Sequence, residues 1–168
     1  MSFSLIPQYA FRLFTDISPG FLSNLGVRFL MLDLDNTVAR YSERIPSIVA
    51  RQWADDMSNN NITLFFISNN RRKDRVRAYA DALGIGFIKE AQKPSPTGIL
   101  KAIAASGFSV EESAFMGDQI FTDTLAANRA GVISIIVRPL SLRNPLLSLR
   151  FAFEAPFRAA CRNRNLVV

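Results

Sequence analysis

The stretch VRFLMLDLDNT, residues 27–37, changes from apolar to acidic within a few positions. Its first part, Val27 to Leu32, is mostly apolar and has the length of a buried β-strand. Asp33 and Asp35 follow at once, two positions apart. In open α/β folds, ligands lie beyond the carboxyl ends of parallel strands, so this layout predicts an α/β protein with a polar site at the end of its first strand.

Four further apolar runs follow, separated by segments with helical periodicity. Predicted strands cover residues 62–67, 86–88, 114–116 and 133–137, and predicted helices cover 46–59, 71–83, 96–106 and 122–130. Strands that alternate with helices indicate parallel pairing through crossover helices. We therefore predict an α/β fold with a Rossmann-like, five-stranded parallel sheet flanked by helices. It would form a single domain over residues 1–168, with a core of about 27–137.

Polar residues directly follow three of these strands. Asp33 follows the first, Ser68 the second and Asp118 the fourth. Because parallel strands point the same way, these side chains should converge at one edge of the sheet. Lys93 precedes a predicted helix and Asp123 comes soon after Asp118, so both can reach that edge. Carboxylates gathered there repel one another unless a cation lies among them, which predicts a divalent metal.

The composition narrows the chemistry. Histidine is absent, and Cys161 is the only cysteine of the chain. These absences exclude Ser-His-Asp and Cys-His catalysis, internal disulfides and multi-cysteine zinc sites. A metal held by oxygen atoms favours a hard ion such as Mg²⁺. The net charge of +6 favours an anionic partner, although solvated basic faces explain it equally well.

Together these segments resemble the four motifs of the haloacid dehalogenase (HAD) superfamily. The motifs are DLDNT at 33–37, ISNN at 67–70, KP at 93–94 and GDQIFTD at 117–123. Their wording is similar to the YqeG-like branch of the subclass IIIA phosphatases, which itself resembles mitochondrial phosphatidylglycerophosphate phosphatases. The resemblance implies a HAD core. The intervals between the motifs are too short for an inserted lid, so we expect no cap domain.

The resemblance also implies a magnesium-dependent phosphatase with a covalent intermediate. Asp33 would attack phosphorus, and Asp35 would protonate the leaving oxygen and then activate water, with Ser68 and Lys93 completing the catalytic set. The implied substrate-binding residues are Thr37, Ser68, Asn69 and Lys93, and the implied Mg²⁺ ligands are Asp33, Asp35, Asp118 and Asp123. Asp35 would contribute its backbone carbonyl. Asp123 would either ligate through water or orient Lys93.

Each motif alone also has an ordinary structural explanation. Asp33 and Asp35 could be turn residues, and Lys93 could be a surface lysine. Ser68 could be a helix N-cap, and Asp123 could interact with a helix dipole. It is the set of four motifs, in this order, that favours catalysis.

The segments outside the core suggest where the substrate lies. After Arg138, leucines and phenylalanines are interleaved with arginines, as in helices that lie on anionic bilayers. Packing on the core explains this segment equally well, and packing is preferred for the apolar residues at positions 3–14. Pro156 is expected to break any single long helix in the C-terminal segment.

We therefore expect a cytoplasmic protein, peripheral to a membrane, that converts phosphatidylglycerophosphate to phosphatidylglycerol. No stretch is apolar and long enough to span a membrane, and residues 1–12 lack the layout of a secretory signal. Two alternatives stay open: a soluble phosphatase for phosphoproteins, nucleic-acid ends or phosphosugars, and a non-catalytic binding module. The basic residues form no nucleic-acid motif, so no nucleic-acid partner is expected.

Overall fold

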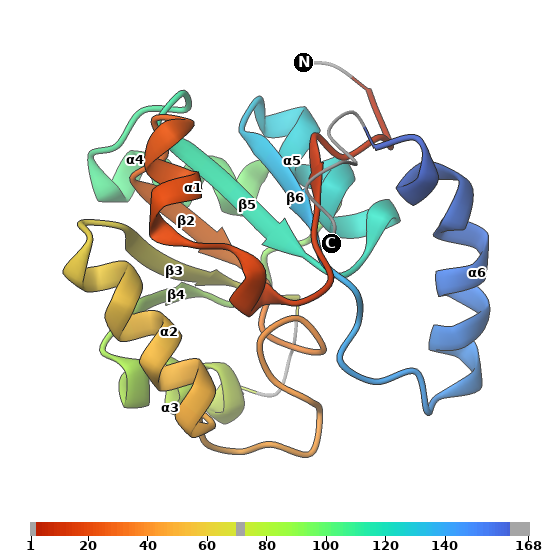
Figure 1. Ribbon diagram of the computed structural model, residues 1–168, viewed down its shortest axis with the longest axis horizontal. Coiled ribbons are helices and arrows are strands. Elements are labelled where there is room, and N and C mark those ends of the chain that lie inside the picture. Colours follow the sequence, from red (N-terminus) through yellow and green to blue (C-terminus); the bar gives the residue numbers. More distant parts are fainter. Residues whose placement is uncertain (1–2, 70–72, 162–168) are drawn as a thin grey trace.

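The computed structural model describes residues 3–69 and 73–161. Within these ranges six parallel strands form one sheet, in the order β1-β6-β5-β2-β3-β4 (Figure 1). The strands are β1 Tyr9–Ala10, β2 Phe29–Leu32, β3 Thr63–Ile67, β4 Gly86–Ile88, β5 Ser113–Gly117 and β6 Ile133–Ile136. The predicted α/β class and parallel sheet are confirmed.

Helices α1 to α5 lie between these strands in the chain, as the alternating pattern predicted for the core, and α6 follows the last strand. They are α1 Pro19–Asn24, α2 Ile48–Asn59, α3 Lys73–Leu83, α4 Thr97–Ser106, α5 Leu125–Ala130 and α6 Pro145–Ala159. A 3-10 turn, η1 Phe14–Asp16, precedes α1, and a π-helical turn, η2 Ile120–Thr124, leads into α5. The predicted helix over 71–83 is seen from Lys73 onward, and its first two residues lie outside the described ranges.

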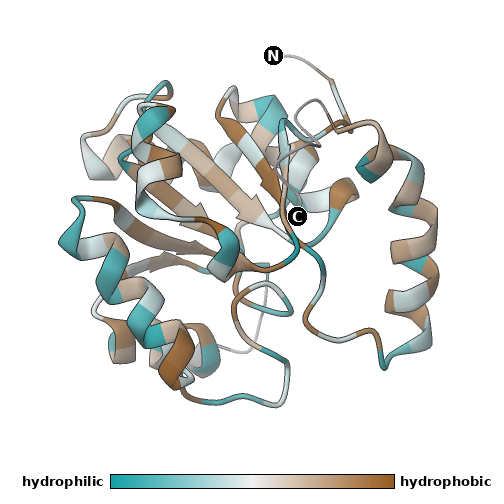
Figure 2. Ribbon diagram, in the orientation of Figure 1, coloured by the Kyte–Doolittle hydropathy of each residue, from teal (hydrophilic) through white to brown (hydrophobic). Residues whose placement is uncertain are grey.

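Two apolar layers hold the helices on the sheet. Leu30 and Leu32 of β2 face one layer, which includes residues of α1, α2 and α3. Phe29 and Met31 of the same strand face the other layer, which includes residues of α4 and α5. Successive residues of a strand point to opposite faces, so an apolar strand can fill both layers. The strands are accordingly coloured brown in Figure 2.

The register of the sheet brings the polar strand ends together. Leu32 at the end of β2 lies opposite Phe66 of β3 and Met116 of β5. Asp33 follows Leu32 directly, while Ser68 and Asp118 each come two residues after these partners. The carboxyl ends of the three central strands therefore present the three residues at one edge of the sheet.

The sheet has one strand more than the sequence predicted. β1 lies in the apolar N-terminal segment and pairs with β6 at the edge of the sheet. Phe11 and Phe14, which follow β1, are buried, so the packing explanation preferred for this segment holds for them, whereas Phe3 and Leu13 are exposed. In the described ranges, neither the loop between β2 and α2 nor the start of α3 carries an inserted domain, consistent with the expected lack of a cap.

The prediction that Pro156 would break the C-terminal helix is wrong. α6 runs through it, from Pro145 to Ala159. Proline lacks an N–H, so the Ala152 carbonyl loses its helical partner, but Pro156 lies near the end of the helix and one bond is lost. The last turn continues, with the Ala160 N–H donating to the Pro156 carbonyl at 3.0 Å. α6 stands to one side of the sheet in Figure 1.

Candidate active site

Lys93 lies at the centre of the polar edge. Its Nζ is 2.6 Å from Oδ1 of Asp33 and 2.8 Å from Oδ1 of Asp123. All three residues are buried. Burial alone would lower the pKa of Lys93, but Asp123 and Asp33 outweigh it and raise this pKa above its ordinary value. Lys93 is therefore a permanent cation that joins the end of β2 to the turn after β5.

Thr37 and Asn36 tie Asp33 to Asp118. The Thr37 hydroxyl lies 3.3 Å from Oδ2 of Asp33 and 3.3 Å from Oδ1 of Asp118. Asn36 Nδ2 is 3.5 Å from Oδ2 of Asp118. Asn36 has φ of 67°, a left-handed conformation that asparagine tolerates better than most residues. This turn directs the side chains after β2 toward the carboxylate of Asp118.

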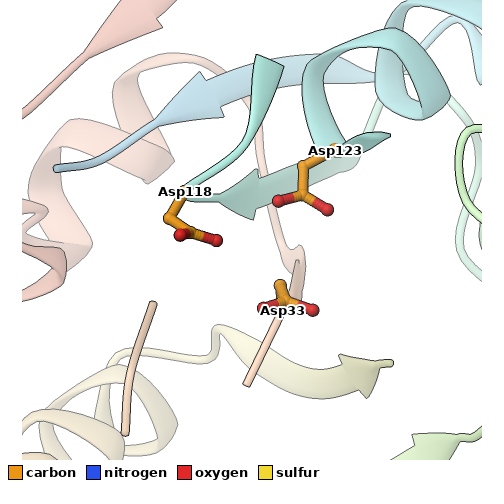
Figure 3. A group of neighbouring side chains, drawn as sticks. All are labelled: Asp33, Asp118 and Asp123. Carbon is orange, nitrogen blue, oxygen red and sulfur yellow. The ribbon is translucent and has the colours of Figure 1, made fainter. Parts of the chain in front are cut away.

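Asp33, Asp118 and Asp123 form a group that could hold a metal ion. One carboxylate oxygen from each lies within 4.8 Å of the others, and the three side chains converge in Figure 3. Burial, with further contributions from Asp123 and from Asp35, raises the pKa of Asp33 to about 7, although Lys93 opposes the rise. Burial, together with Asp123 and Asp33, raises the pKa of Asp118 well above its ordinary value. A bound cation would relieve this repulsion, and an all-oxygen donor set fits Mg²⁺, the predicted cofactor.

Asp35 lies beside these carboxylates but outside the group of three. Its Oδ1 accepts a hydrogen bond from Nε of Arg75 at 2.8 Å. Arg75 also donates to the carbonyls of Arg40, at 2.6 Å, and Glu43. The guanidinium therefore fastens the loop after β2 to α3 and fixes the Asp35 carboxylate, a contact that the sequence prediction missed.

Asn69 holds the loop that carries Lys93. Its Nδ2 donates to the Lys93 carbonyl at 2.9 Å, and its Oδ1 accepts from the Lys93 N–H at 2.8 Å. The prediction assigned Asn69 to substrate binding, and its amide is engaged with backbone instead in this structure. Ser68 is buried next to it, and the Ser68 carbonyl accepts the Ala91 N–H at 3.0 Å.

Asp123 is placed by η2 and by the absence of a side chain at Gly117. A Cβ on Gly117 would lie closer than 3.0 Å to the Asp123 carboxyl group. Oδ2 of Asp123 accepts the Gln119 N–H at 3.0 Å. π-helical turns are frequent at functional sites, and this one aims Asp123 back toward Lys93. Both predicted roles of Asp123 are compatible with its position, which is paired with Lys93 and near Asp33 and Asp118.

These residues open onto a cavity of about 490 Å³. Its lining includes the predicted Asp33, Asp35, Ser68, Asn69, Lys93 and Asp123. It also includes Tyr41, Arg75, Gln119 and Thr122, which the sequence prediction did not single out. Tyr41 is about half exposed, and its partial burial, together with the nearby carboxylates of Asp118, Asp35 and Asp33, raises its pKa. Of the predicted residues, Thr37 and Asp118 are buried and do not line the cavity, and the Thr37 hydroxyl joins Asp118 to Asp33 of the lining.

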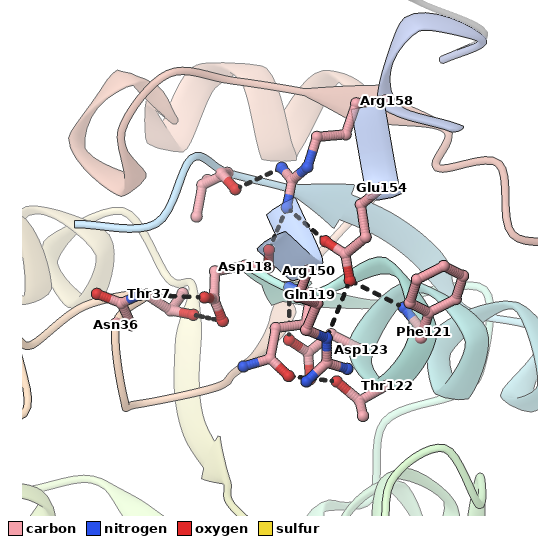
Figure 4. A network of polar contacts seen from close by, with 11 residues as sticks. Asn36, Thr37, Asp118, Gln119, Phe121, Thr122, Asp123, Arg150, Glu154 and Arg158 are labelled. Atoms are coloured by element: carbon pink, nitrogen blue, oxygen red, sulfur yellow. Dashed lines mark hydrogen bonds and ion pairs between the residues drawn. The ribbon is translucent and has the colours of Figure 1, made fainter. Parts of the chain in front are cut away.

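α6 contacts the backbone of the segment that carries Asp118 and Asp123. Arg158 of this helix donates to the backbone carbonyl of Asp118, and Glu154 accepts the Phe121 N–H at 3.4 Å (Figure 4). Glu154 is buried and pairs with both Arg150 and Arg158. Two arginines of the basic C-terminal segment are thus directed inward rather than toward solvent.

One edge of the parallel sheet holds three neighbouring carboxylates, the buried Lys93 and the carboxylate of Asp35. This arrangement defines a metal-dependent hydrolase of phosphate esters. The family model of haloacid dehalogenase-like hydrolases matches residues 39–131. The "Probable phosphatase YqeG" of Bacillus subtilis (strain 168) is 32% identical over 127 residues, covering 74% of this chain and 72% of that protein. The chain belongs to the haloacid dehalogenase-like hydrolase family, and the resemblance to HAD phosphatases is confirmed.

Solved structures agree on the fold. A hypothetical protein from Xanthomonas campestris has a TM-score of 0.55 at 17% identity and covers 72% of each chain. The cobalt-bound deoxy-D-mannose-octulosonate 8-phosphate phosphatase YrbI of Haemophilus influenzae has a TM-score of 0.54 at 12% identity, over 80% of this chain and 90% of that one. At these identities the likeness extends to the fold alone.

Proposed function

We propose that the chain is a Mg²⁺-dependent phosphomonoesterase that acts through an aspartyl-phosphate on Asp33. We further propose phosphatidylglycerophosphate, presented at a membrane surface, as its substrate. The observation that carries the chemistry is the position of Asp33, which lines the cavity with its Oδ1 2.6 Å from Lys93. A nucleophilic carboxylate needs its charge, and a bound Mg²⁺ would supply the cation that keeps buried Asp33 ionised.

Asp33 and Asp35 would divide the reaction between them. In the first step an Asp33 oxygen forms a bond to phosphorus while the ester bond to the leaving oxygen breaks, and Asp35 donates a proton to that oxygen. In the second step Asp35 takes a proton from water, whose oxygen bonds to phosphorus while the bond from phosphorus to the Asp33 oxygen breaks, which releases phosphate and restores the Asp33 carboxylate. Lys93 offsets the charge on the nucleophile, and the Arg75 contact holds Asp35 at the cavity wall.

Exposed apolar side chains support a membrane-bound substrate. On α6, Leu146 and Phe153 are 74% and 64% exposed. Ile45, in the loop that also carries Tyr41, is 70% exposed, and Ile48, the first residue of α2, is 74% exposed. A helix with an exposed apolar face is suited to lie in a lipid interface. Among the described residues, no helix is long and apolar enough to cross a membrane.

Basic side chains near both segments favour an anionic surface. Arg44 lies beside Ile45, and Arg143 lies just before α6, and both are exposed. Juxtaposed basic and apolar residues are typical of segments that bind anionic lipid. The YqeG relative supports a phosphatase, and the lipid substrate rests on this surface and on the motif wording.

The test is phosphate release from phosphatidylglycerophosphate in mixed micelles, with Mg²⁺ or with EDTA. Wild type should turn over with Mg²⁺ alone, and Asp33→Asn should lose activity by roughly four orders of magnitude because the nucleophile is gone. Asp55→Asn removes an exposed carboxylate of α2 and should keep wild-type turnover.

Three outcomes separate the parts of the proposal. Hydrolysis of an aryl phosphate but not of the lipid, with the same dependence on Mg²⁺ and Asp33, would leave the chemistry and reject the lipid substrate. Failure to bind liposomes of anionic lipid at low salt would reject the membrane surface. Silence on both substrates would favour the non-catalytic binding module.

A further inference from the structure

α6 turns charge inward and apolar side chains outward. Glu154 is 1% exposed, whereas Leu146 and Phe153 on the same helix are largely exposed. A helix that only packs on a core normally does the opposite. Burying ions is unfavourable even when they are paired, and an apolar residue would fill the same space more stably. Packing alone therefore does not explain why this face of α6 buries charged side chains.

Arg158 connects α6 to the ends of two strands. One terminal nitrogen donates to the backbone carbonyl of Asp118, just after β5, and the other donates to the Val137 carbonyl, just after β6, at 2.9 Å. The planar guanidinium can hold both carbonyls in one fixed geometry. Its Nε is buried and finds no acceptor among the described residues. Burial lowers the pKa of Arg158.

Glu154 holds the next part of the same segment. Its Oε2 is 3.1 Å from Arg158, and its Oε1 accepts the Phe121 N–H at 3.4 Å. Phe121 belongs to η2, the turn that carries Asp123, and its ring contacts that of Phe157. Arg158 and Glu154 of α6 therefore form hydrogen bonds with the backbone of Asp118 and of Phe121, which lies two residues before Asp123 (Figure 4).

We propose that Glu154 and Arg158 are positioning residues that set the affinity of the site for a divalent cation. Neither residue lines the cavity, and both act through the backbone that fixes two of the three carboxylates. Outer contacts of this kind typically change metal affinity by about 10–100-fold when they are removed. The inference rests on the proposed function only in placing the metal at Asp33, Asp118 and Asp123.

Arg158→Lys is the informative variant. Lysine keeps the positive charge and can still pair with Glu154, but one ammonium cannot hold both carbonyls in the fork geometry. The matched control is Arg150→Lys, because Arg150 pairs with the same Glu154 at 3.3 Å and has no hydrogen bond to the Asp118 segment among the described contacts. Both variants keep the positive charge. A difference in metal affinity between them therefore reports the loss of the hydrogen bonds from Arg158 to the backbone carbonyls.

The readout is metal binding to the full chain without substrate, with Mg²⁺ followed by calorimetry and Mn²⁺ by electron paramagnetic resonance. Arg158→Lys should weaken binding by about 10-fold or more, and Arg150→Lys should stay within about twofold of wild type. Thermal unfolding in EDTA accompanies each titration. If Arg158→Lys unfolds at the working temperature, Glu154→Gln replaces it and should weaken binding by a similar factor.

Wild-type affinity in a folded Arg158→Lys or Glu154→Gln variant would overturn the inference. Equal losses in Arg158→Lys and Arg150→Lys would also overturn it, because the effect would then come from the ion pairs alone. If the wild-type protein bound neither Mg²⁺ nor Mn²⁺, the inference would also be rejected. Metal binding by wild type without turnover of phosphatidylglycerophosphate would reject the lipid substrate and leave the inference standing.

Discussion

Two groups of buried charge lie side by side in this protein and differ in how their charges are matched. The first, called the catalytic group after the proposed function, consists of Asp33, Asp118 and Asp123 around Lys93, three carboxylates with one ammonium. The helix group consists of Glu154 between Arg150 and Arg158, one carboxylate with two guanidinium groups. The groups meet at the Asp118 backbone, where Arg158 donates its hydrogen bond.

The difference shows which group is built to bind a ligand. In the helix group Glu154 has a cation on both sides, and hydrogen bonds to backbone carbonyls absorb part of the excess positive charge. In the catalytic group the negative charge exceeds what Lys93 can offset, and the pKa of Asp33 rises to about 7, chiefly through burial. A protein retains an uncompensated buried charge where a cation is to be bound, because a closed structural pair would be more stable.

Among the tests that compare the two groups, the largest effect is expected from a methyl group placed against the catalytic group. Gly117→Ala puts a Cβ closer than 3.0 Å to the Asp123 carboxyl group, so Asp123 must move away from Lys93. A displacement of about 1 Å typically lowers turnover by roughly 100-fold. We expect that loss in phosphatase assays, together with weaker Mg²⁺ binding.

Gly20→Ala is the matched control. Its added Cβ would meet only the Ser18 hydroxyl, at 4.0 Å, within α1 and far from the catalytic group in sequence. This variant should keep wild-type turnover. Wild-type turnover in Gly117→Ala as well would show that the close packing around Asp123 has no role in catalysis.

The catalytic group was largely predictable from the sequence because its signals are local. Asp33, Ser68 and Asp118 each follow a short apolar run, and parallel strands bring such positions to one edge. β1 was missed because a two-residue strand is defined only by its pairing with β6, which is distant in sequence. The same holds for Arg75, whose contact with Asp35 joins two separate elements.

The helix group is also visible in the sequence as a regular spacing, but this spacing did not enter the prediction. Arg150, Glu154 and Arg158 are spaced four residues apart, so they share one face of a helix and can pair. Such a face is usually exposed to solvent, and the sequence was interpreted in terms of lipid or general packing. Only the docking of α6 against η2 reveals that this face is buried, and docking depends on contacts between distant elements.

A smaller effect is expected on the pH dependence of stability in EDTA. The pKa of Asp33 is about 7 in the folded protein, against an ordinary value of 3.8, so the folded chain binds a proton that the unfolded chain has lost. The free energy of unfolding should therefore rise as the pH falls from about 7 to 5, and it should fall again when the pH is raised back to 7. We expect a gain of about 2 kcal/mol, or roughly 5 °C in melting temperature.

Addition of Mg²⁺ and the Asp33→Asn variant test whether the dependence of stability on pH comes from the carboxylates of the catalytic group. Saturating Mg²⁺ should raise the melting temperature at pH 7 more than at pH 5, because metal and proton compete for the same carboxylates. Asp33→Asn should flatten the slope in EDTA. A melting temperature in EDTA that is constant or falls from pH 7 to 5 would mean that the catalytic carboxylates are not strained by their charge.

The smallest effect is the sharpest test of the comparison, because one chemical change is made in each group. Asp118→Asn and Glu154→Gln both replace a buried carboxylate by its amide. In EDTA, Asp118→Asn removes repulsion with Asp33 and Asp123 and should stabilise the fold by about 1 kcal/mol. Glu154→Gln leaves Arg150 and Arg158 without their counterion and should destabilise it by about the same amount.

Chemical unfolding of both variants, with and without Mg²⁺, decides between charge and packing. Opposite signs in EDTA would mean that the catalytic group carries uncompensated negative charge while Glu154 stabilises the fold through its ion pairs with Arg150 and Arg158. Losses of equal size in both would mean that hydrogen bonds such as that from Thr37 to Asp118 outweigh the charge. Saturating Mg²⁺ should reverse the order of wild type and Asp118→Asn, since the metal stabilises only the chain that still offers all three carboxylates.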